Sequence, residues 1–174
     1  MAIKNFKSFF LKTLIIVRHA KSSWEDVMQN DFDRPLNERG KEEAPIMGKR
    51  LANKKINIDV FVSSPAKRAY KTAKLFIKEF DRSKDEILLV KELYEASVTN
   101  FQQVVKSLDN KFDSAAIFSH NPGITDFANS LSLVKIDNMP TSGIFAVKAS
   151  VKKWSDFNSA IKEFLFFDYP KNIL

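Results

Sequence analysis

Four short runs of consecutive apolar residues constrain the fold of this chain more than any other feature of its sequence. The runs are residues 14–17, 60–62, 87–90 and 115–118. Within each run the apolar residues follow one another instead of alternating with polar ones, which is typical of strands buried on both faces of a sheet. We therefore expect a sheet that lies between two other layers of structure.

The segments between these runs carry apolar residues at helical spacing. They are residues 42–54, 66–80 and 100–108. Alternation of strands with helices predicts an α/β fold, a three-layer sandwich whose central sheet is mostly parallel.

The last part of the chain adds two more predicted strands, at residues 143–148 and 161–167. We expect them to pair antiparallel, so that the sheet has an antiparallel edge strand. The aromatic residues of this tail are expected to pack in the core, with a dimer surface as the alternative. The chain is accordingly predicted to be a monomer or a weak dimer.

Length predicts one domain. A chain of 174 residues is of the usual size for a single core. Residues 13–174 are interpreted as that domain, and the basic and aromatic residues 1–12 as an N-terminal extension.

Missing residue types exclude several kinds of chemistry. The chain has no cysteine, which removes disulfides, thiolate metal sites and cysteine nucleophiles. Its four glycines cannot form a Walker A loop or a dinucleotide-binding turn. Its two histidines, His19 and His120, are too few for a multi-histidine metal site. We therefore expect neither a metal nor a cofactor.

The charge balance favours an anionic partner. Lys and Arg number 28 and Asp and Glu number 21, which gives a formal net charge of +7, although such an excess also serves to keep a surface soluble. The lysines show no aromatic–basic repeat, so no nucleic-acid partner is predicted. The run at residues 14–17 is too short for a signal peptide or a membrane span. We predict a cytoplasmic protein with no membrane partner.

Three polar motifs directly follow three of the predicted strands. They are residues 18–22 (RHAKS), 63–68 (SSPAKR) and 119–123 (SHNPG). In open α/β sheets, ligands bind outside the carboxyl ends of the strands. The three motifs are therefore expected to meet in one crevice.

Two of these motifs also predict helix starts. Ser64-Pro65 and Asn121-Pro122 each place a capping residue before a proline, which is favoured at the first helical position. Free N–H groups at helix N-termini suit an anion. With the arginines and histidines of the motifs, they indicate a phosphate site.

The residues of this crevice allow phosphate transfer without a metal. A histidine can attack phosphorus and form a covalent intermediate, which water then hydrolyses. Arg18 and Arg68 are expected to hold the phosphate oxygens, where transition-state charge lies. A protonated His120 is expected to add a third positive donor.

Taken together, the motifs resemble those of the histidine phosphatase superfamily, the phosphoglycerate-mutase-like phosphatases. The matching segments are residues 14–20 (LIIVRHA), 33–40 (DRPLNERG), 63–73 (SSPAKRAYKTA) and 119–123 (SHNPG). Their order and spacing fit from about Thr13 to Val147. Within the superfamily the short chain is similar to the small SixA-like phosphohistidine phosphatases. The resemblance implies the phosphoglycerate-mutase-like fold, His19 as the nucleophile, and a phosphate pocket of Arg18, His19, Arg68 and His120.

Three positions need comment against the family pattern. Ala20 replaces the glycine of Arg-His-Gly, a change that restricts the backbone if the position requires positive φ. Ser119 replaces the glycine before His120. The family also commonly has a carboxylic general acid, for which Glu95 is the best match and Glu92 the runner-up.

The leading hypothesis is a metal-independent phosphatase that removes phosphate from phosphohistidine on a protein. One alternative is a monoesterase for a small phosphorylated metabolite, which gains from a general acid because an alkoxide is a poor leaving group. A mutase is disfavoured, since it needs a covered pocket that excludes water. The non-enzymatic alternative is a phosphate-binding module that has lost turnover.

Overall fold

A six-stranded sheet in the order β3-β2-β4-β1-β5-β6 is the middle layer of the computed structural model, which describes residues 10–25 and 28–172. The strands are β1 Lys12–Arg18, β2 Val60–Ser63, β3 Ile87–Leu89, β4 Ser114–Ser119, β5 Ile144–Ala149 and β6 Lys162–Asp168. β1 to β4 are mutually parallel, and β5 runs antiparallel to both of its neighbours. The six predicted strands and the mostly parallel sheet are confirmed.

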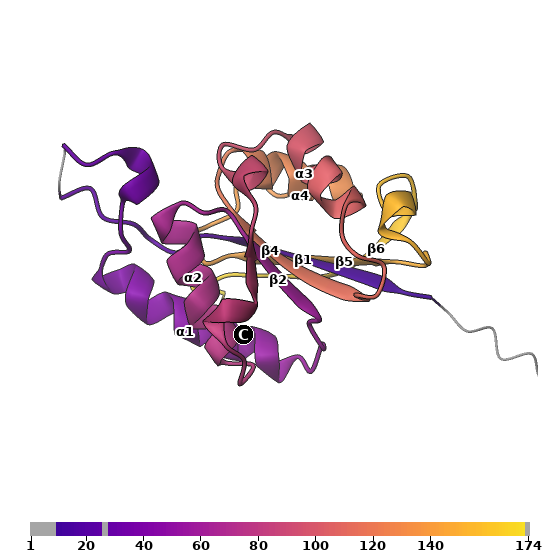
Figure 1. Ribbon diagram of the computed structural model, residues 1–174, viewed down its shortest axis with the longest axis horizontal. Coiled ribbons are helices and arrows are strands. Elements are labelled where there is room, and N and C mark those ends of the chain that lie inside the picture. The colour runs from indigo at the N-terminus through magenta and orange to yellow at the C-terminus, as the bar shows by residue number, and fades with distance from the viewer. Residues whose placement is uncertain (1–9, 26–27, 173–174) are drawn as a thin grey trace, which may run out of the picture.

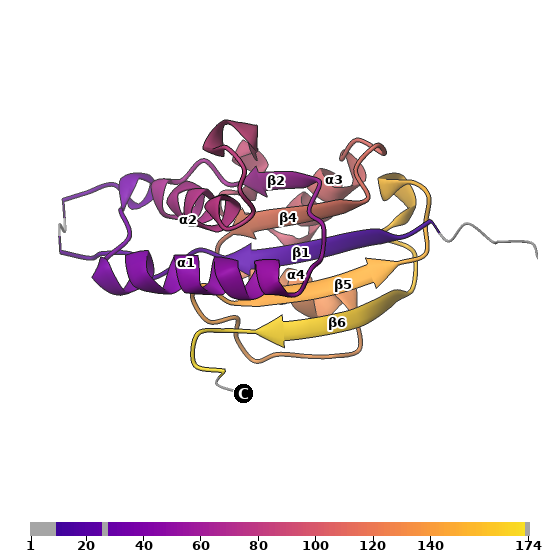
Figure 2. The same cartoon turned by 90° about the horizontal axis from the view of Figure 1, so that it is seen from below.

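Four helices cover the two faces of the sheet. Helices α1 (Glu38–Asn53) and α2 (Lys67–Lys78) lie on one face, and α3 (Val98–Lys106) and α4 (Gly123–Leu131) lie on the other, as Figures 1 and 2 show. The predicted three-layer sandwich is therefore confirmed. Short 3-10 turns complete the structure: η1 Asp31–Asp33, η2 Lys84–Glu86, η3 Lys91–Leu93 and η4 Trp154–Asp156.

Strand β1 shows why the apolar residues of the sheet are consecutive. Leu14 and Ile16 belong to the core on the α3 and α4 side. Ile15 and Val17 belong to the core on the α1 and α2 side. Since successive side chains of a strand point to opposite faces, a strand covered on both sides needs apolar residues at every position.

Helix α1 begins four residues before the apolar periodicity that predicted it. Asn37 is its N-cap and accepts a hydrogen bond from the Gly40 backbone N at 2.9 Å. The Lys21 backbone oxygen would lie only 2.1 Å from a Cβ at Gly40. A side chain there would push the start of α1 away from the segment that follows β1, so glycine is required.

The tail of the chain closes the sheet at one edge. β5 lies between β1 and β6, and β6 is the edge strand. Trp154 and Phe157 are fully buried, as expected of core residues. The phenylalanines of β6 are half-buried (Phe164, Phe166 and Phe167). The predicted oligomeric state stays a prediction.

The N-terminal extension lies largely outside the described residues, because the description begins at residue 10 and β1 begins at Lys12. Within the described part of the chain, no helix has the length and apolar character that crossing a membrane requires.

The start of α4 is expected to be intolerant of a side chain at Gly123. A Cβ on this residue would lie 1.8 Å from the Ala96 backbone oxygen, so Gly123→Ala should lower the free energy of unfolding by about 2 kcal/mol or more. Urea unfolding followed by circular dichroism measures this. Ser130→Ala, at an exposed position of the same helix, is the control and should change stability by less than about 0.5 kcal/mol. A Gly123→Ala protein as stable as this control would contradict the close approach.

Candidate active site

The two histidines meet where β1 and β4 end. His19 follows β1 and His120 follows β4, and these strands are parallel neighbours. The His19 backbone N donates to the Ser119 backbone O at 3.0 Å, which holds the two strand ends together. The two imidazole rings lie 5.1 Å apart between centroids, and both are buried. The structure thus brings these two predicted site residues together at one end of the sheet.

His19 is held with one ring nitrogen available. Its Nδ1 lies 2.8 Å from the Ala20 backbone oxygen. A carbonyl oxygen can only accept, so Nδ1 carries the proton and Nε2 keeps its lone pair. Burial, followed by the positive charges of Arg68, Arg18 and Arg34, lowers the pKa of His19 to about 3. Near neutral pH this ring is uncharged, the state in which an imidazole is nucleophilic.

Arg68 lies in the first turn of α2, as predicted, and faces that free nitrogen. Its Nε donates to Nε2 of His19 at 3.3 Å. The rest of its guanidinium is held by Asp31, through the backbone oxygen at 2.5 Å and Oδ2 at 2.9 Å. An oxyanion bound to Nε2 of His19 would therefore lie next to a fixed positive charge.

Arg18 approaches from the end of β1. Its Nη1 donates to the Met139 backbone oxygen at 2.7 Å, while its buried Nε makes no hydrogen bond. Burial lowers the pKa of Arg18 from its usual value. A buried guanidinium with an unused donor is strongly stabilised by an anionic ligand, which suits the predicted role.

His120 differs from the sequence-based expectation of a protonated ring. Burial, followed by the nearby His19 and Arg68, lowers the pKa of His120 to about 2. Its Nε2 and the Ser64 hydroxyl form a hydrogen bond of 2.8 Å, and its buried Nδ1 has no partner. In this structure the ring is therefore neutral near pH 7, because desolvation disfavours its charged form. The role of His120 as a donor to phosphate stays a prediction. A phosphate dianion is the kind of charge that would raise this pKa again.

The predicted helix caps were wrong. Helix α2 starts after Ala66, which makes no side-chain cap, and α4 starts after Pro122. The hydroxyl of Ser64 binds His120 instead. The side-chain oxygen of Asn121 accepts from the Thr125 hydroxyl at 2.7 Å. The Ser64 hydroxyl also accepts from the Ala66 backbone N at 3.3 Å, and Thr125 belongs to the first turn of α4. Both side chains therefore join the pocket to the start of a helix without occupying its N-cap position.

Both departures from the family pattern fit the backbone without strain. Ala20 is not among the described residues with positive φ, and its N–H donates to the Thr72 hydroxyl at 2.9 Å. The Ser119 hydroxyl donates to the Leu93 backbone oxygen at 2.6 Å. This bond ties η3, which precedes Glu95, to the end of β4.

Glu95 lines the open side of the pocket. It borders a cavity of about 510 Å³ together with Arg68 and His120, whereas Glu92 does not. Glu95 is exposed and adopts a φ of 51°, a value uncommon outside glycine. Of the two glutamates named from the sequence, Glu95 is thus the one near the phosphate-binding side chains.

Asp31 and Tyr94 are residues of the pocket that sequence reasoning missed. Oδ2 of Asp31 accepts from Arg68 and from the Tyr94 hydroxyl, each at 2.9 Å. These contacts lower the pKa of Asp31 even though burial opposes them. Asp31 is the first residue of the short 3-10 turn η1, which has no apolar periodicity and follows no strand.

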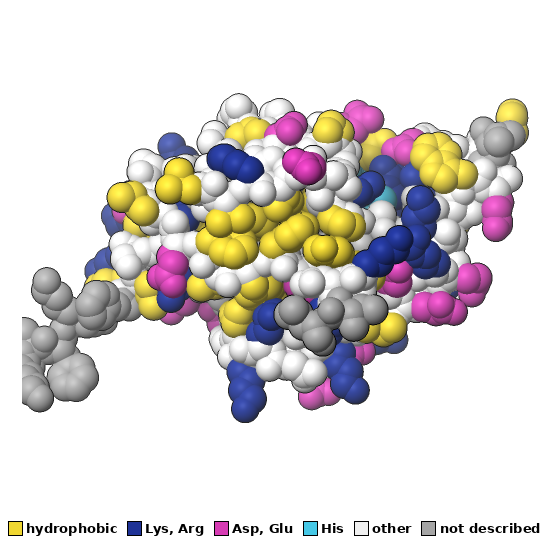
Figure 3. Space-filling view, turned by 180° about the vertical axis from the view of Figure 1, so that it is seen from behind, with side chains coloured by type: hydrophobic (Ala, Val, Ile, Leu, Met, Phe, Trp, Pro, Cys, Tyr) yellow, Lys and Arg dark blue, Asp and Glu magenta, His cyan; other side chains and the backbone are white. Residues whose placement is uncertain are grey.

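Arg34 lies in the segment 33–40 that resembles the family pattern, but its place in the sequence predicted no role for it. Its side chain is buried, donates to the Ser22 hydroxyl at 2.6 Å, and stacks on Trp24 with 3.4 Å from Cζ to the ring centroid. Two of its nitrogens make no hydrogen bond. Because its charge helps to lower the pKa of His19, it belongs to the same electrostatic centre. In Figure 3 a histidine reaches the surface beside side chains of Lys and Arg.

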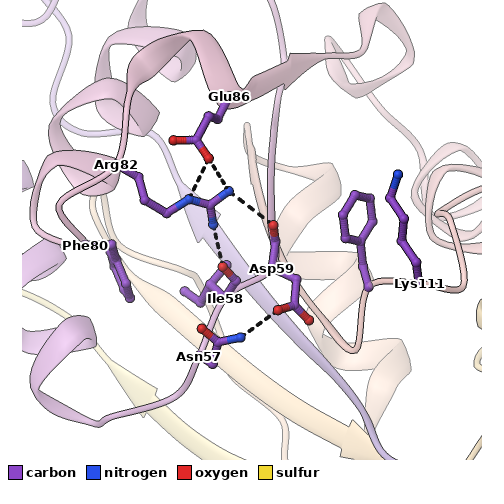
Figure 4. A pocket seen from close by; sticks show the side chains of 8 residues that line it. Asn57, Ile58, Asp59, Phe80, Arg82, Glu86 and Lys111 are labelled. Carbon is purple, nitrogen blue, oxygen red and sulfur yellow. Dashed lines mark hydrogen bonds and ion pairs between the residues drawn. The ribbon is translucent and has the colours of Figure 1, made fainter.

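A second cavity, of about 530 Å³, lies at the opposite ends of the strands (Figure 4). The guanidinium of Arg82, which lines this cavity, already donates to Glu86 and to the backbone oxygens of Ile58 and Asp59. The Asp59 carboxylate accepts from Asn57 and from two backbone N–H groups. Lys111, which also lines this cavity, pairs with Asp109 at 3.2 Å. The charged side chains described in the lining therefore all have a partner already.

Comparisons with known proteins concern the family and the fold of this chain. The model of the histidine phosphatase superfamily (branch 1) matches residues 14–131. Phosphoserine phosphatase 1 of Hydrogenobacter thermophilus is 45% identical over 62 residues, which are 34% of this chain and 28% of that protein. The SixA protein of Nakamurella multipartitia has a TM-score of 0.80 at 22% identity, over 92% of this chain and 97% of the other. A protein histidine phosphatase SixA complexed with tungstate has a TM-score of 0.77 at 23% identity, over 92% and 98%.

The matches to solved structures differ in coverage from the matches to curated sequences. The structural matches lie below 25% identity and concern the fold, which is phosphoglycerate-mutase-like as expected. The chain spans well under half of the length of the first curated relatives, at 28%, 42% and 25%.

The buried histidines predict a specific loss of stability in acid. The pKa of each folded-state ring lies below the value near 6.5 of an unfolded histidine. Below about pH 6.5 the unfolded chain therefore binds protons that the folded chain does not, and the free energy of unfolding should fall by about 2 kcal/mol per histidine between pH 7 and pH 5. Urea unfolding at both pH values measures this loss.

The matched control is the double variant His19→Gln/His120→Gln, which should lose most of the pH dependence. If the variant loses as much stability between pH 7 and pH 5 as the unchanged protein, carboxylates and not the two histidines are responsible.

Proposed function

The chain belongs to the histidine phosphatase superfamily, and from that premise we propose that it is a metal-independent phosphatase that removes phosphate from phosphohistidine on a protein. The observation that carries the proposal is the state of His19. This neutral ring has its proton fixed on Nδ1 by Ala20 and its Nε2 directed at Arg68. Such a nitrogen can attack phosphorus without first losing a proton.

The first step transfers phosphate to His19. Nε2 forms a bond to phosphorus while the bond from phosphorus to the leaving nitrogen breaks. We expect Arg68, which contacts His19, and Arg18, whose Nε makes no hydrogen bond, to stabilise the charge on the phosphate oxygens. His120 is a further donor, either as the neutral ring or after protonation favoured by the dianion.

In the second step water attacks the phosphorus held by His19. The P–N bond breaks, inorganic phosphate leaves, and Nε2 regains its lone pair. One proton from the water ends on phosphate or in solvent. The balance needs no metal and no redox partner.

The carboxylates that line the cavity favour a substrate whose leaving group is a nitrogen. Asp31, Glu95 and Asp126 all line the cavity that holds Arg68 and His120. The histidine of the substrate leaves most easily when the phosphohistidine ring is protonated, because the leaving group is then a neutral imidazole. A carboxylate such as that of Asp31 can accept the N–H of this cationic ring and favour its charged form.

A phosphate monoester is the second candidate substrate. The observation that favours it is the location of Glu95 in the same cavity, where a carboxylic acid could protonate a leaving alkoxide. The non-catalytic alternative has less support, since Ala20 and Ser119 fit without backbone strain.

His19→Ala is expected to abolish turnover while the protein stays folded, because the nucleophile is lost. The measurement is phosphate release from a phosphohistidine peptide, a phosphoserine peptide and an aryl phosphate, with chelator present throughout. The unchanged protein should be as active with chelator as without it. Activity retained by His19→Ala would eliminate His19 as nucleophile, and strong inhibition by chelator would eliminate the metal-free mechanism.

Two conservative variants should separate the two substrate classes. Glu95→Gln is expected to slow aryl phosphate hydrolysis by about tenfold or more and to alter phosphohistidine hydrolysis little, since only the ester needs an acid. Asp31→Asn should slow phosphohistidine hydrolysis more than ester hydrolysis. The value to compare is kcat/KM for each substrate. Equal effects on both substrates would show that these carboxylates only support the shape of the pocket.

A further inference from the structure

A basic groove lies between the starts of α1 and α2, apart from the catalytic pocket. It encloses about 310 Å³, and we refer to it as the lysine groove. Its lining residues are Pro35, Leu36, Lys41, Lys67, Tyr70, Lys71 and Lys74. Four of these carry a positive charge and none carries a negative one.

The positive charges of the groove are poorly compensated. Lys67, Lys71 and Lys74 follow one another along a single stripe of α2, four and three residues apart. None of these three has an ion-pair partner among residues 10–25 and 28–172, while Lys41 pairs with the exposed Glu38. Burial and then the charges of Lys84 and Lys71 lower the pKa of Lys74. Like charges on one helix face repel, and an anionic ligand would relieve this repulsion.

Two segments of the chain contribute neighbouring residues to the groove and to the catalytic pocket. Lys67 precedes Arg68 in the first turn of α2, and Pro35 follows Arg34. The two arginines are buried near His19, whereas Lys67 is exposed and lines the groove. A molecule whose phosphate contacts Arg68 would therefore have its flanking parts beside the lysines.

The floor of the groove is fixed and partly apolar. Leu36 is buried and pairs with Ser22 through an isolated β-bridge. The Nζ of Lys74 lies 3.9 Å from the centroid of the Tyr70 ring, which positions this ammonium group over an aromatic face. Such a floor accommodates the aliphatic part of a side chain while the lysines bind its charged end.

We propose that the lysine groove is the docking surface for acidic side chains of the phosphorylated protein substrate. This inference rests on the proposed function, because it assumes that a protein is held at the pocket. Charge complementarity supports an acidic partner. The patch is short and enclosed, which suits one or two Asp or Glu side chains, whereas a nucleic-acid backbone is bound along a longer basic track.

The test compares two phosphohistidine peptides, one with Asp and Glu around the phosphorylated residue and one with Gly and Ser. Free phosphohistidine is the third substrate, since it cannot reach the groove. At low salt the acidic peptide should have a kcat/KM about tenfold above that of the neutral peptide, and the difference should shrink as salt is added. Lys71→Glu/Lys74→Glu should abolish the preference and leave hydrolysis of free phosphohistidine within about twofold.

The matched control places the same charge change on another part of the surface. Lys106→Glu/Lys153→Glu alters two exposed lysines of α3 and of the segment before η4. This variant should keep the preference for the acidic peptide. Equal loss in the control and in Lys71→Glu/Lys74→Glu would overturn the proposal in favour of a general effect of net charge.

The remaining outcomes separate the groove from the proposed function. Equal rates on both peptides by an enzyme that hydrolyses free phosphohistidine would overturn the groove and leave the function standing. If no phosphohistidine substrate is hydrolysed, the proposed function fails, and binding of the unphosphorylated acidic peptide still tests the groove. That binding should weaken at least tenfold in Lys71→Glu/Lys74→Glu. No binding, or tighter binding of a single-stranded DNA oligonucleotide that the same variant abolishes, would overturn the proposal.

Discussion

The parallel pairing of β1 with β4 is the constraint on which the whole pocket depends. It places Arg18 opposite Ser119, so the residues that follow, His19 and His120, leave the sheet side by side. β2 pairs with the other edge of β4 and brings the start of α2, with Arg68, to the same end. Three segments far apart in the sequence thus supply one site. The catalytic chemistry follows from strand order, because any other neighbour for β4 would separate the two rings.

Electrostatics then decides the state of these residues. Burial lowers the pKa of His19 most, and the positive charges of Arg68, Arg18 and Arg34 lower it further. The same burial that makes a positive histidine unfavourable leaves guanidinium nitrogens of Arg18 and Arg34 without a hydrogen bond, although Nε of Arg34 lies 3.5 Å from Oδ1 of Asp31. The pocket therefore combines a neutral His19 with guanidinium nitrogens that make no hydrogen bond. This combination has a cost in the free protein and is favourable with an anion, which accounts for a folded site whose polar groups are incompletely paired.

Sequence alone predicted the sheet, its layers and the convergence of four side chains, because strand burial and strand ends leave local signals. The wrong predictions concern choices that depend on neighbours. Ser64 has the features of a helix cap, but it contacts His120, which is 56 residues away in the sequence. The lowered pKa of His120 could not be predicted either, because the burial of its ring cannot be deduced from its place after a strand. Asp31 was missed for a similar reason, since its partners Arg68 and Tyr94 come from other segments.

The attachment of the segment around Glu95 has a consequence for how this scaffold can change its substrate. The Ser119 hydroxyl holds Leu93 on one side, and Gly123 packs against the Ala96 oxygen on the other. The backbone is therefore held in place on both sides of Glu95, at Leu93 and at Ala96. It has little freedom to move toward Arg68 and His120 or away from them. New specificity on this framework would arise by exchanging the side chain at position 95 and not by reshaping the loop. A glycine at position 119 would remove the first of these two attachments, and the position of residue 95 as well as its identity would then be free to change.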